Sequence, residues 1–513
     1  MLRDARVRCS LAVLLAAAAR LPTAAASDGV VGPGGCDEAG FDAVLATVQD
    51  SGGGTITFDC GAAPTTIPIT SYAAISAAVT IDGGDRITLD AGGAAAFFQV
   101  FSGARLELRH LTLRGGTFGG VNVLENFGAL ELSSVAILDS TSSALVNYGS
   151  TLVQSSRFAD NAAPAGDAGA ALRNEGGTAL IADTTFSGNV VAGDTGTGGA
   201  IAANAGTLEM HRSTFTTNRA PDGGAIFVGA DASARIEQST FSGNRAGYAG
   251  AIETWSSDLG IRTSRFDGNA AESGDGGAIW SLGGSPAIEY DQFTDNTAAT
   301  TGGAVSCSAD VLNVSRSAFG SNRAGAAGGA LYGGCGFLVT DSTFHANTAG
   351  AGAGGGAIYH TGARYAGVFF TTIADNAAGY GGGIVSESSD GTSVNLFGVL
   401  LAGNDGGNCA GVLTSGGYNV SDDSYCGGAF GGPGDLGSTP VPLQAFADHG
   451  GPTDTQPPQA GSAAIDRIPS DVCLGVGAGP LDQRGAARPA GAVCDSGAYE
   501  LGGIVDEIFG DGF

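Results

Sequence analysis

The sequence has no lysine, so all 22 of its basic residues are arginine, and 50 acidic residues outnumber them. The formal net charge is −28. This balance argues against nucleic acid as a partner, because binding to backbone phosphates needs a cationic face. The surplus of carboxylates instead favours solubility.

Long apolar runs are also missing, and no segment after residue 26 is long enough to cross a membrane as a helix. Residues 1–26 carry Arg3, Arg6 and Arg8 near their start, continue with the apolar stretch Leu11–Ala19 and end with Ala24–Ala26. This order is typical of a secretory signal peptide. A membrane anchor is disfavoured because the apolar stretch is about half a bilayer span. We therefore predict a signal peptide over residues 1–26 and an exported protein.

The cysteines show no Cys-x-x-Cys spacing, which argues against a zinc site. Cys9 leaves with the signal peptide, so eight cysteines remain in an oxidising compartment. We expect four pairs, of which Cys307 with Cys335 joins neighbouring repeats at an offset of two residues. This offset exceeds disulfide reach unless Gly333 and Gly334 bend the chain. The expected pairs are Cys36 with Cys60, Cys307 with Cys335, Cys409 with Cys426 and Cys473 with Cys494.

An asparagine recurs ten times at intervals of 25 to 29 residues, which is the signature of a solenoid. An apolar residue, usually Phe, lies three positions before every one of them, and Ser or Thr lies two positions before most of these apolar residues. This alternation predicts a short strand with Phe and Ser on one side. Asn tolerates the left-handed conformation of a sharp bend, and its amide can bond stacked equivalents. The ten asparagines are Asn161, Asn189, Asn218, Asn244, Asn269, Asn296, Asn322, Asn347, Asn376 and Asn404.

Two further strands are visible in each repeat, one after a Gly-Gly-Ala pattern and one in a Gly-x-Leu pattern such as Gly128–Leu132. Helical repeats are excluded because 90 glycines leave no amphipathic stretches with a period of 3.6 residues. We predict an all-β, right-handed parallel β-helix solenoid with three short strands per coil of about 26 residues. Coils that stack at about 4.8 Å bury a continuous apolar and Ser/Thr-lined interior.

The segments at the two ends differ from the repeats. Residues 27–78 are expected to form an N-terminal cap and the first strands, with a helix around Phe41–Val48 that covers the open end of the solenoid. The predicted β-helix extends over residues 79–404. An irregular closing segment and linker rich in Gly, Pro and Asp follows over residues 405–460.

Residues 461–500 differ in character from the repeats and resemble a known C-terminal module. The stretches Ser462–Asp466, Asp482–Gly485 with Arg488-Pro489, and Cys494–Glu500 resemble the C-terminal module of bacterial secreted right-handed β-helix proteins of the choice-of-anchor type. The coils resemble the repeats of polymorphic outer-membrane proteins and of adhesin-like proteins with the pectate lyase fold. These resemblances imply a protein that is secreted or held on the bacterial outer cell surface. A tail over residues 501–513 resembles a short sorting signal.

Strand alternation predicts which side chains stand on the outer surface of the coils. If the Ile of each Gly-Gly-Ala-Ile faces inward, the next residue faces outward, and so does the residue two positions further. Exposed aromatic side chains in a row suit sugar rings or a partner protein. The alternatives are that a loop covers this face or that the alternation is inverted. The candidate ligand-binding residues are Phe227, Glu253, Trp255, Trp280, Tyr332, Tyr359 and His360.

Metal and catalytic sites have little support in the sequence. Asp167, Asp194 and Asp222 occupy one loop position in three successive coils, where they are either Ca²⁺ ligands or simple turn formers. We expect no other cofactor. Lyases and hydrolases of this fold need a Ca²⁺ carboxylate set with a Lys or Arg base, or clustered aspartates, and neither pattern is evident.

The sequence therefore predicts a non-enzymatic, adhesive or glycan-binding surface protein. Its partner would be a surface glycan or a protein on a host or neighbouring cell. A carbohydrate-active enzyme, either a polysaccharide lyase or a glycosidase, and a purely structural rod are the alternatives.

Overall fold

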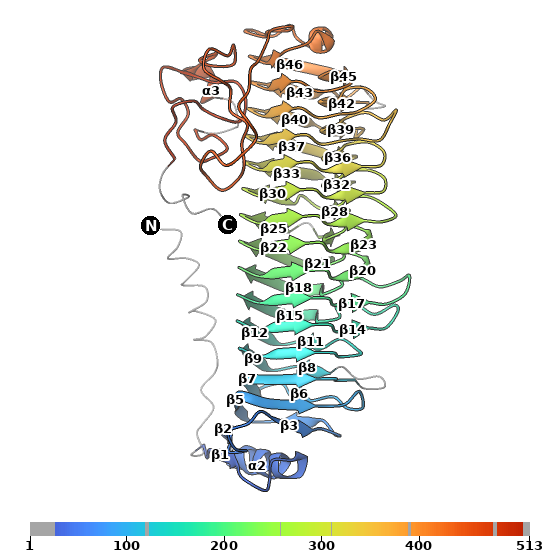
Figure 1. Cartoon of the computed structure of the whole chain (residues 1–513), viewed down its shortest axis with the longest axis vertical. Helices are drawn as coiled ribbons and strands as arrows, with labels where there is room; N and C mark the ends of the chain where they lie inside the picture. The colour runs from blue at the N-terminus through green and yellow to red at the C-terminus, as the bar shows by residue number, and fades with distance from the viewer. Residues whose placement is uncertain are drawn as a thin grey trace.

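The computed structural model describes residues 26–117, 123–256, 258–308, 310–387, 391–475 and 480–505. These residues form a rod of stacked coils, with helix α2 (Glu38–Asp50) across its N-terminal end (Figure 1). Residues 1–25 of the predicted signal peptide and residues 506–513 of the predicted tail lie outside the described part of the chain. No helix in that part is both long and apolar enough to span a membrane.

Each coil contributes a strand to each of three walls, and the strands of one wall pair in parallel with their equivalents in the next coil. The isoleucine wall follows the Gly-Gly-Ala pattern. It contains β4 (Ala73–Ile75), β6 (Phe98–Val100), β8 (Leu124–Asn126), β11 (Leu145–Asn147), the first parts of β15 (Leu172–Ala182), β18 (Ile201–His211) and β21 (Ile226–Glu237), β24 (Ile252–Thr254), β28 (Ile279–Ser281), β32 (Val305–Cys307), β36 (Leu331–Gly333), β39 (Ile358–His360), β42 (Ile384–Ser386) and β45 (Cys409–Gly411).

The leucine wall comes next along each coil. It contains β2 (Gly53–Phe58), the first parts of β5 (Ala78–Asp90) and β7 (Arg105–Arg114), β9 (Ala129–Ser133), β12 (Ser150–Gln154), the second parts of β15, β18 and β21, β25 (Leu259–Arg262), β29 (Ala287–Glu289), β33 (Val311–Ser315), β37 (Gly336–Thr340), β40 (Ala366–Phe369), β43 (Val394–Phe397) and β46 (Leu413–Gly417). Strand β1 (Gly29–Val31) pairs with β2 at its end.

The phenylalanine wall completes the coil. It contains β3 (Thr65–Pro68), the second parts of β5 and β7, β10 (Ala136–Leu138), β13 (Arg157–Ala159), β16 (Thr185–Ser187), β19 (Thr214–Thr216), β22 (Thr240–Ser242), β26 (Arg265–Asp267), β30 (Gln292–Thr294), β34 (Ala318–Gly320), β38 (Thr343–His345), β41 (Thr372–Ala374), β44 (Leu400–Ala402) and β47 (Val420–Ser421). The predicted coil of three short parallel strands is confirmed.

A small second sheet lies in the loops between the phenylalanine wall and the isoleucine wall. Its seven strands are β14 (Ala162–Ala163), β17 (Val190–Val191), β20 (Arg219–Asp222), β23 (Arg245–Tyr248), β27 (Ala270–Ala271), β31 (Thr297–Ala298) and β35 (Arg323–Ala324). These loops project along one side of the rod (Figure 1). Four short elements remain near the C-terminal end: η1 (Tyr425–Gly428), α3 (Ser470–Cys473), and the antiparallel strands β48 (Ile468–Pro469) and β49 (Val493–Cys494).

The core of the rod is a column of phenylalanine rings. Eight rings from successive coils lie face to face, with centroids 4.6 to 5.1 Å apart. The Ser and Thr residues two positions earlier also face inward, as the alternation predicts, and Ser239 is an example that is fully enclosed. The stacked rings are Phe158, Phe186, Phe215, Phe241, Phe266, Phe293, Phe319 and Phe344.

The repeated asparagines form a buried ladder of amides. Each side-chain amide N–H donates to the side-chain oxygen of the next Asn at 2.9 to 3.0 Å, from Asn161 to Asn404. The stacking role predicted for the amide is thus confirmed. The predicted left-handed backbone is not at Asn, however, but at the preceding residue, such as Thr217 (φ 53°) and Gly268 (φ 61°). The bend therefore precedes the ladder, which leaves Asn free to point into the core.

The N-terminal end is closed as expected. Helix α2 packs Phe41, Leu45 and Val48 into the core, and Asp37 caps it by accepting the N–H of Gly40 at 2.9 Å. The helix is longer than the predicted stretch because it begins at this cap and ends at the glycines after Asp50.

All four predicted disulfides are confirmed. In the pair Cys307–Cys335 the Cα atoms lie 5.6 Å apart. Cys307 faces Gly333 in register, and the N–H of Gly334 donates to the Cys307 carbonyl, so the chain turns at the two glycines and brings Cys335 within reach. The bend that the sequence required therefore exists.

Residues 441–475 and 480–505, here called the side module, pack against the phenylalanine wall near the C-terminal end of the rod (Figure 1). Gln292 donates to Asp454 at 2.8 Å, and Thr343 donates to Gln483 at 2.6 Å. Most residues that carry the resemblance to an anchor module, including Asp482, are buried. These residues therefore make contacts inside this protein, whereas anchoring stays a prediction.

The contact between the side module and the rod centres on the buried side chain of Arg488. Its guanidinium lies 3.5 Å from the carboxylates of Asp341 on the rod and Glu500 on the module, above the ring of Phe370. Burial raises the pKa of Asp341 to about 7, and Arg488 opposes that shift. The charged groups are thus removed from water and depend on one another.

We expect Asn269→Leu to lower the free energy of unfolding by about 3 to 5 kcal/mol, because buried donors and acceptors on Asn244, Phe241 and Asn296 lose their partner. Denaturant melts of the purified protein measure this change. The matched control Asn313→Leu alters an outward position of the leucine wall and should cost less than about 1 kcal/mol. Equal losses in the two variants would contradict the ladder's structural role.

We expect Arg488→Met to cost about 3 to 5 kcal/mol, since it leaves two buried carboxylates without their cation. Arg364→Met is the control, because the exposed pair of Arg364 with Asp310 should contribute less than about 1 kcal/mol. Thermal denaturation compares the two. An Arg488 variant as stable as the parent would show that the side module does not depend on this contact.

Candidate functional site

Five residues on three neighbouring coils form what we call the aromatic cluster: Phe227, Tyr248, Glu253, Trp255 and Trp280. Trp255 is the most exposed member, with 52% of its surface accessible, and its indole N–H donates to the Glu253 carboxylate at 2.6 Å. Tyr248 is also exposed, at 40%. The ring of Phe227 meets Trp255 edge-on, with centroids 6.0 Å apart. Tyr248 stacks on Trp280 at 4.9 Å.

Strand alternation on the isoleucine wall places most of this cluster, as predicted. Ile226, Ile252 and Ile279 face the core, so the residues that follow them face outward. Tyr248 comes instead from β23 in the loop sheet, which lies over the wall. The sequence interpretation missed Tyr248, although its place four residues before an inward Ile was a usable signal.

The prediction of one continuous, open row of aromatic side chains is wrong. The loops cover most of the outward column, so only 9% of Phe227 and of Tyr359 and 2% of Glu253 remain accessible. Between the coils of Trp280 and Tyr332, the column holds the buried Ser306. One continuous face is therefore replaced by two separate groups of aromatic side chains.

The second group surrounds the carboxylate of Glu387. Tyr359 and Tyr380 both donate hydroxyl hydrogen bonds to it, and Tyr332 stacks on Tyr359 with centroids 5.7 Å apart. Tyr380 occupies the same loop position as Tyr248, four residues before an inward Ile. Both groups thus combine a loop tyrosine, a wall aromatic and a carboxylate.

His360 is a correction, because it does not belong to either surface group. It lies two residues after the inward Ile358, which gives it the same inward direction, and it is fully buried with Phe337 edge-on at 5.3 Å. The expectation that it stands on the outer face is therefore wrong.

Glu253 is the most unusual group of the aromatic cluster. One carboxylate oxygen accepts the hydrogen bond from the indole N–H of Trp255, whereas the other is buried and has no hydrogen-bond partner among the described residues. The buried indole N–H of Trp280, on the paired strand, likewise has none within that part of the chain. Burial raises the pKa of Glu253 to about 7, the hydrogen bond from Trp255 opposes this shift, and the charge of Asp222 adds to it.

The three aspartates considered as Ca²⁺ ligands are distributed over different surroundings. Asp167 forms an ion pair with Arg173, Asp194 is exposed, and Asp222 lies beside Glu253, where burial raises its pKa. No group of three or more His, Cys, Asp or Glu side chains in the described ranges has a geometry that could hold a metal ion. The arrangement therefore gives the calcium hypothesis no support.

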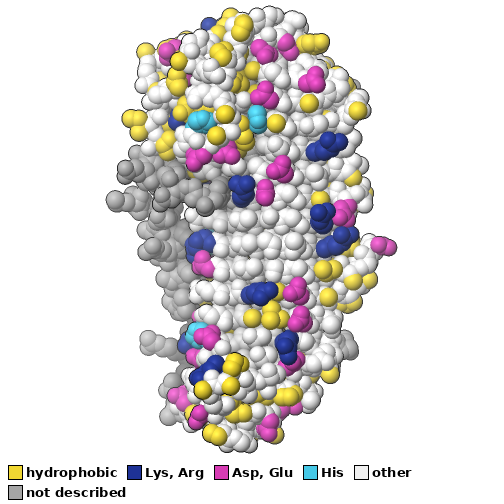
Figure 2. Space-filling view, viewed as in Figure 1, with side chains coloured by type: hydrophobic (Ala, Val, Ile, Leu, Met, Phe, Trp, Pro, Cys, Tyr) yellow, Lys and Arg dark blue, Asp and Glu magenta, His cyan; other side chains and the backbone are white. Residues whose placement is uncertain are grey.

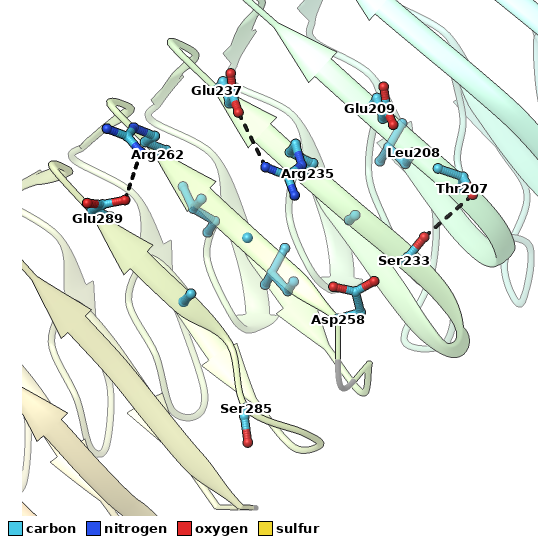
Figure 3. Close-up of a pocket in the computed structure, with 15 residues that line it drawn as sticks. Thr207, Leu208, Glu209, Ser233, Arg235, Glu237, Asp258, Arg262, Ser285 and Glu289 are labelled. Atoms are coloured by element: carbon cyan, nitrogen blue, oxygen red, sulfur yellow. Dashed lines mark hydrogen bonds and ion pairs between the residues drawn. The ribbon is translucent and has the colours of Figure 1, made fainter. Parts of the chain in front are cut away.

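A groove of about 430 Å³ lies on the leucine wall of the same coils (Figure 3). We call it the polar groove, and strands β18, β21, β25 and β29 form its floor. Arg235 and Glu237 pair at 3.7 Å, and Arg262 and Glu289 pair at 2.9 Å. The sequence interpretation overlooked this wall because it followed aromatic residues only. Its full lining is Thr207, Leu208, Glu209, Ser233, Ala234, Arg235, Glu237, Asp258, Leu259, Gly260, Ile261, Arg262, Ser285, Ala287 and Glu289.

The cations of the surface are largely neutralised by neighbouring carboxylates. Of the 18 arginines in the described ranges, 14 form ion pairs. Figure 2 shows this pattern on one face, where blue basic side chains lie next to magenta acidic ones. With a net charge of −28, neither the aromatic cluster nor the polar groove offers a free cationic surface.

The raised pKa of Glu253 predicts a change of stability with pH. Between about pH 4.5 and pH 7 the folded protein holds this proton more tightly than the unfolded chain, so stability decreases as the pH rises through that window. The loss attributable to Glu253 is at most about 3 kcal/mol.

Glu253→Gln should remove this part of the pH dependence and keep an oxygen that accepts the N–H of Trp255. Other buried carboxyls with a raised pKa, such as Asp291 and Asp341, act in the same direction in both proteins, so the difference between parent and variant is the relevant quantity. Melting temperatures recorded from about pH 4 to 8 measure it. Parallel curves for the two proteins would contradict the assigned pKa.

The comparison with known protein families agrees with the fold of stacked coils. A family model described as a right handed beta helix region matches residues 198–372, about a third of the chain. Searches of curated proteins and of solved structures found no match. The matched residues include the coils that form the aromatic cluster and the polar groove. The family match and the three walls of parallel strands together identify the chain as a right-handed parallel β-helix protein.

Proposed function

We propose that this is an exported, non-enzymatic protein of the bacterial outer cell surface that binds glycans through the aromatic cluster. The observation that carries the proposal is the pairing of Trp255 with Glu253: an exposed indole is fixed in place by a buried carboxylate. A fixed aromatic ring loses little conformational freedom when a sugar ring stacks on it.

The two buried groups without partners are complementary to a hydroxyl. The free oxygen of Glu253 accepts a hydrogen bond, and the indole N–H of Trp280 donates one. A hydroxyl group donates and accepts at once, so one sugar hydroxyl satisfies both. Both atoms are buried, so the hydroxyl reaches them through a local shift of the neighbouring side chains, while Trp255 keeps its hydrogen bond to Glu253 and stacks on the sugar. A buried polar group that gains a partner in this way favours binding.

One observation favours a second candidate, glycoside hydrolysis. A general acid must hold its proton near neutral pH and needs a second carboxylate close by. Glu253 has a pKa of about 7, and the charge of Asp222 acts on it. This candidate is ranked second because Oε1 of Glu253 is engaged by Trp255 and only 2% of Glu253 is accessible.

We expect Trp255→Ala to weaken glycan binding by about 1 to 3 kcal/mol, the range for a central aromatic anchor, and to leave the melting temperature nearly unchanged. A glycan array with the purified protein identifies ligands, and calorimetric titration measures affinity. Tyr425→Ala is the control, because Tyr425 is also an exposed aromatic residue but lies near the C-terminal end of the rod.

Loss of melting temperature together with binding would mean that Trp255 supports the fold instead. Unchanged binding in the variant would contradict the proposed site. Hydrolysis of a bound glycan by the parent, abolished in Glu253→Gln while binding persists, would establish the second candidate.

A further inference from the structure

The aromatic cluster and the polar groove meet at one corner of the same coils. Strand β24 ends at Thr254 on the isoleucine wall, and β25 begins at Leu259 on the leucine wall. Trp255 belongs to the cluster and Asp258 lines the groove. Because Asp258 comes three positions after Trp255, their Cα atoms are at most about 11 Å apart.

The groove owes its depth to two small outward residues. Gly260 and Ala287 are register partners on β25 and β29, and a Cβ added at Gly260 would meet no atom within 4 Å. On either side stand longer side chains, including Arg235, Arg262 and Glu289 (Figure 3). The floor is therefore flat and open, and the rims are polar.

The rims suit a hydroxyl-rich ligand better than a peptide. Strand β25 pairs with β21 and β29 on its two sides, so its backbone groups are taken and a peptide cannot add as another strand. Arginine side chains offer donors, and carboxylates and hydroxyls offer acceptors, along both rims. Hydroxyl groups of sugars can use both kinds.

The charges of the groove disfavour an acidic ligand. Arg235 and Arg262 are each held by a carboxylate, and Arg316 of the next coil contacts Glu289 at 3.3 Å. Glu209 and Asp258 have no ion pair within the described residues. A polyanionic chain would meet these two carboxylates and find every arginine already neutralised.

We propose that the glycan ligand is a neutral linear oligosaccharide that stacks on Trp255 and continues around the corner, past Asp258, into the polar groove. The oligosaccharide thus runs along the strand direction and follows one coil, from Trp255 past Asp258 to Gly260. The volume of the groove, about 430 Å³, falls in the range of sites that enclose small ligands and fits a short run of sugar rings. This inference rests on the proposed function, and it adds the charge class, the path and a length requirement.

Calorimetric titration with neutral disaccharides and hexasaccharides of cellulose, maltose and chitin types, and with hexagalacturonate, tests the proposal. A neutral hexasaccharide should bind the parent about tenfold more tightly than its disaccharide, and hexagalacturonate should not bind. Gly260→Leu fills the floor without backbone strain and should abolish the length preference while disaccharide affinity stays the same. Ala287→Leu repeats this test from β29.

Asn313→Leu is the matched control, because Asn313 follows Ala287 in the same outward column and lies outside the groove. It should bind like the parent, and melting temperatures verify that all variants are folded. A length preference that survives in both groove variants, or tighter binding of hexagalacturonate, would overturn the inference alone. Failure of every saccharide tested, hexagalacturonate included, to bind the parent would count against the proposed function itself and therefore against both.

Discussion

The amide ladder inside the rod is the constraint on which the rest of the structure depends. Each Asn donates to the next at 2.9 to 3.0 Å, and the adjoining phenylalanine rings stack at 4.6 to 5.1 Å, so both columns require a constant rise per coil. A coil with a different rise would leave buried amides without partners, which is costly. The repeated left-handed residue before each Asn turns the chain so that the amide reaches this column.

A constant rise has a consequence for function, because it fixes outward side chains as strictly as inward ones. Glu253 and Trp280 are neighbours on the isoleucine wall since Ile252 and Ile279 are neighbours in the core. The same coils put Arg235, Gly260 and Ala287 side by side on the leucine wall. Both candidate surfaces are therefore built on paired strands with little freedom to move, which favours recognition by preorganised groups.

The side module and the loops decide which parts of these walls remain accessible. The side module covers the phenylalanine wall near the C-terminal end through Gln483, Arg488 and their partners on the rod. The loop strands cover the isoleucine wall, so Trp255 stands out mainly because it lies in the turn beyond them. The leucine wall carries the groove instead. The two proposals thus concern the surfaces that neither covering element occupies.

Sequence periodicity alone was enough to derive the coil, the inward Phe column and the stacking of the Asn amides, because each depends on contacts between equivalent positions of adjacent repeats. The cap helix followed instead from apolar residues at helical spacing, and the four disulfides from the grouping of the cysteines along the chain. The sequence interpretation wrongly put His360 on the outer face. Alternation within its own strand gives His360 the same inward direction as Ile358, and the residue is buried. The sequence also could not show that Tyr248 covers Trp280, or that Gly260 opens a groove, since these depend on loops and walls meeting in space. The pKa of Glu253 likewise arises from burial by segments distant in the chain, which only the tertiary structure determines.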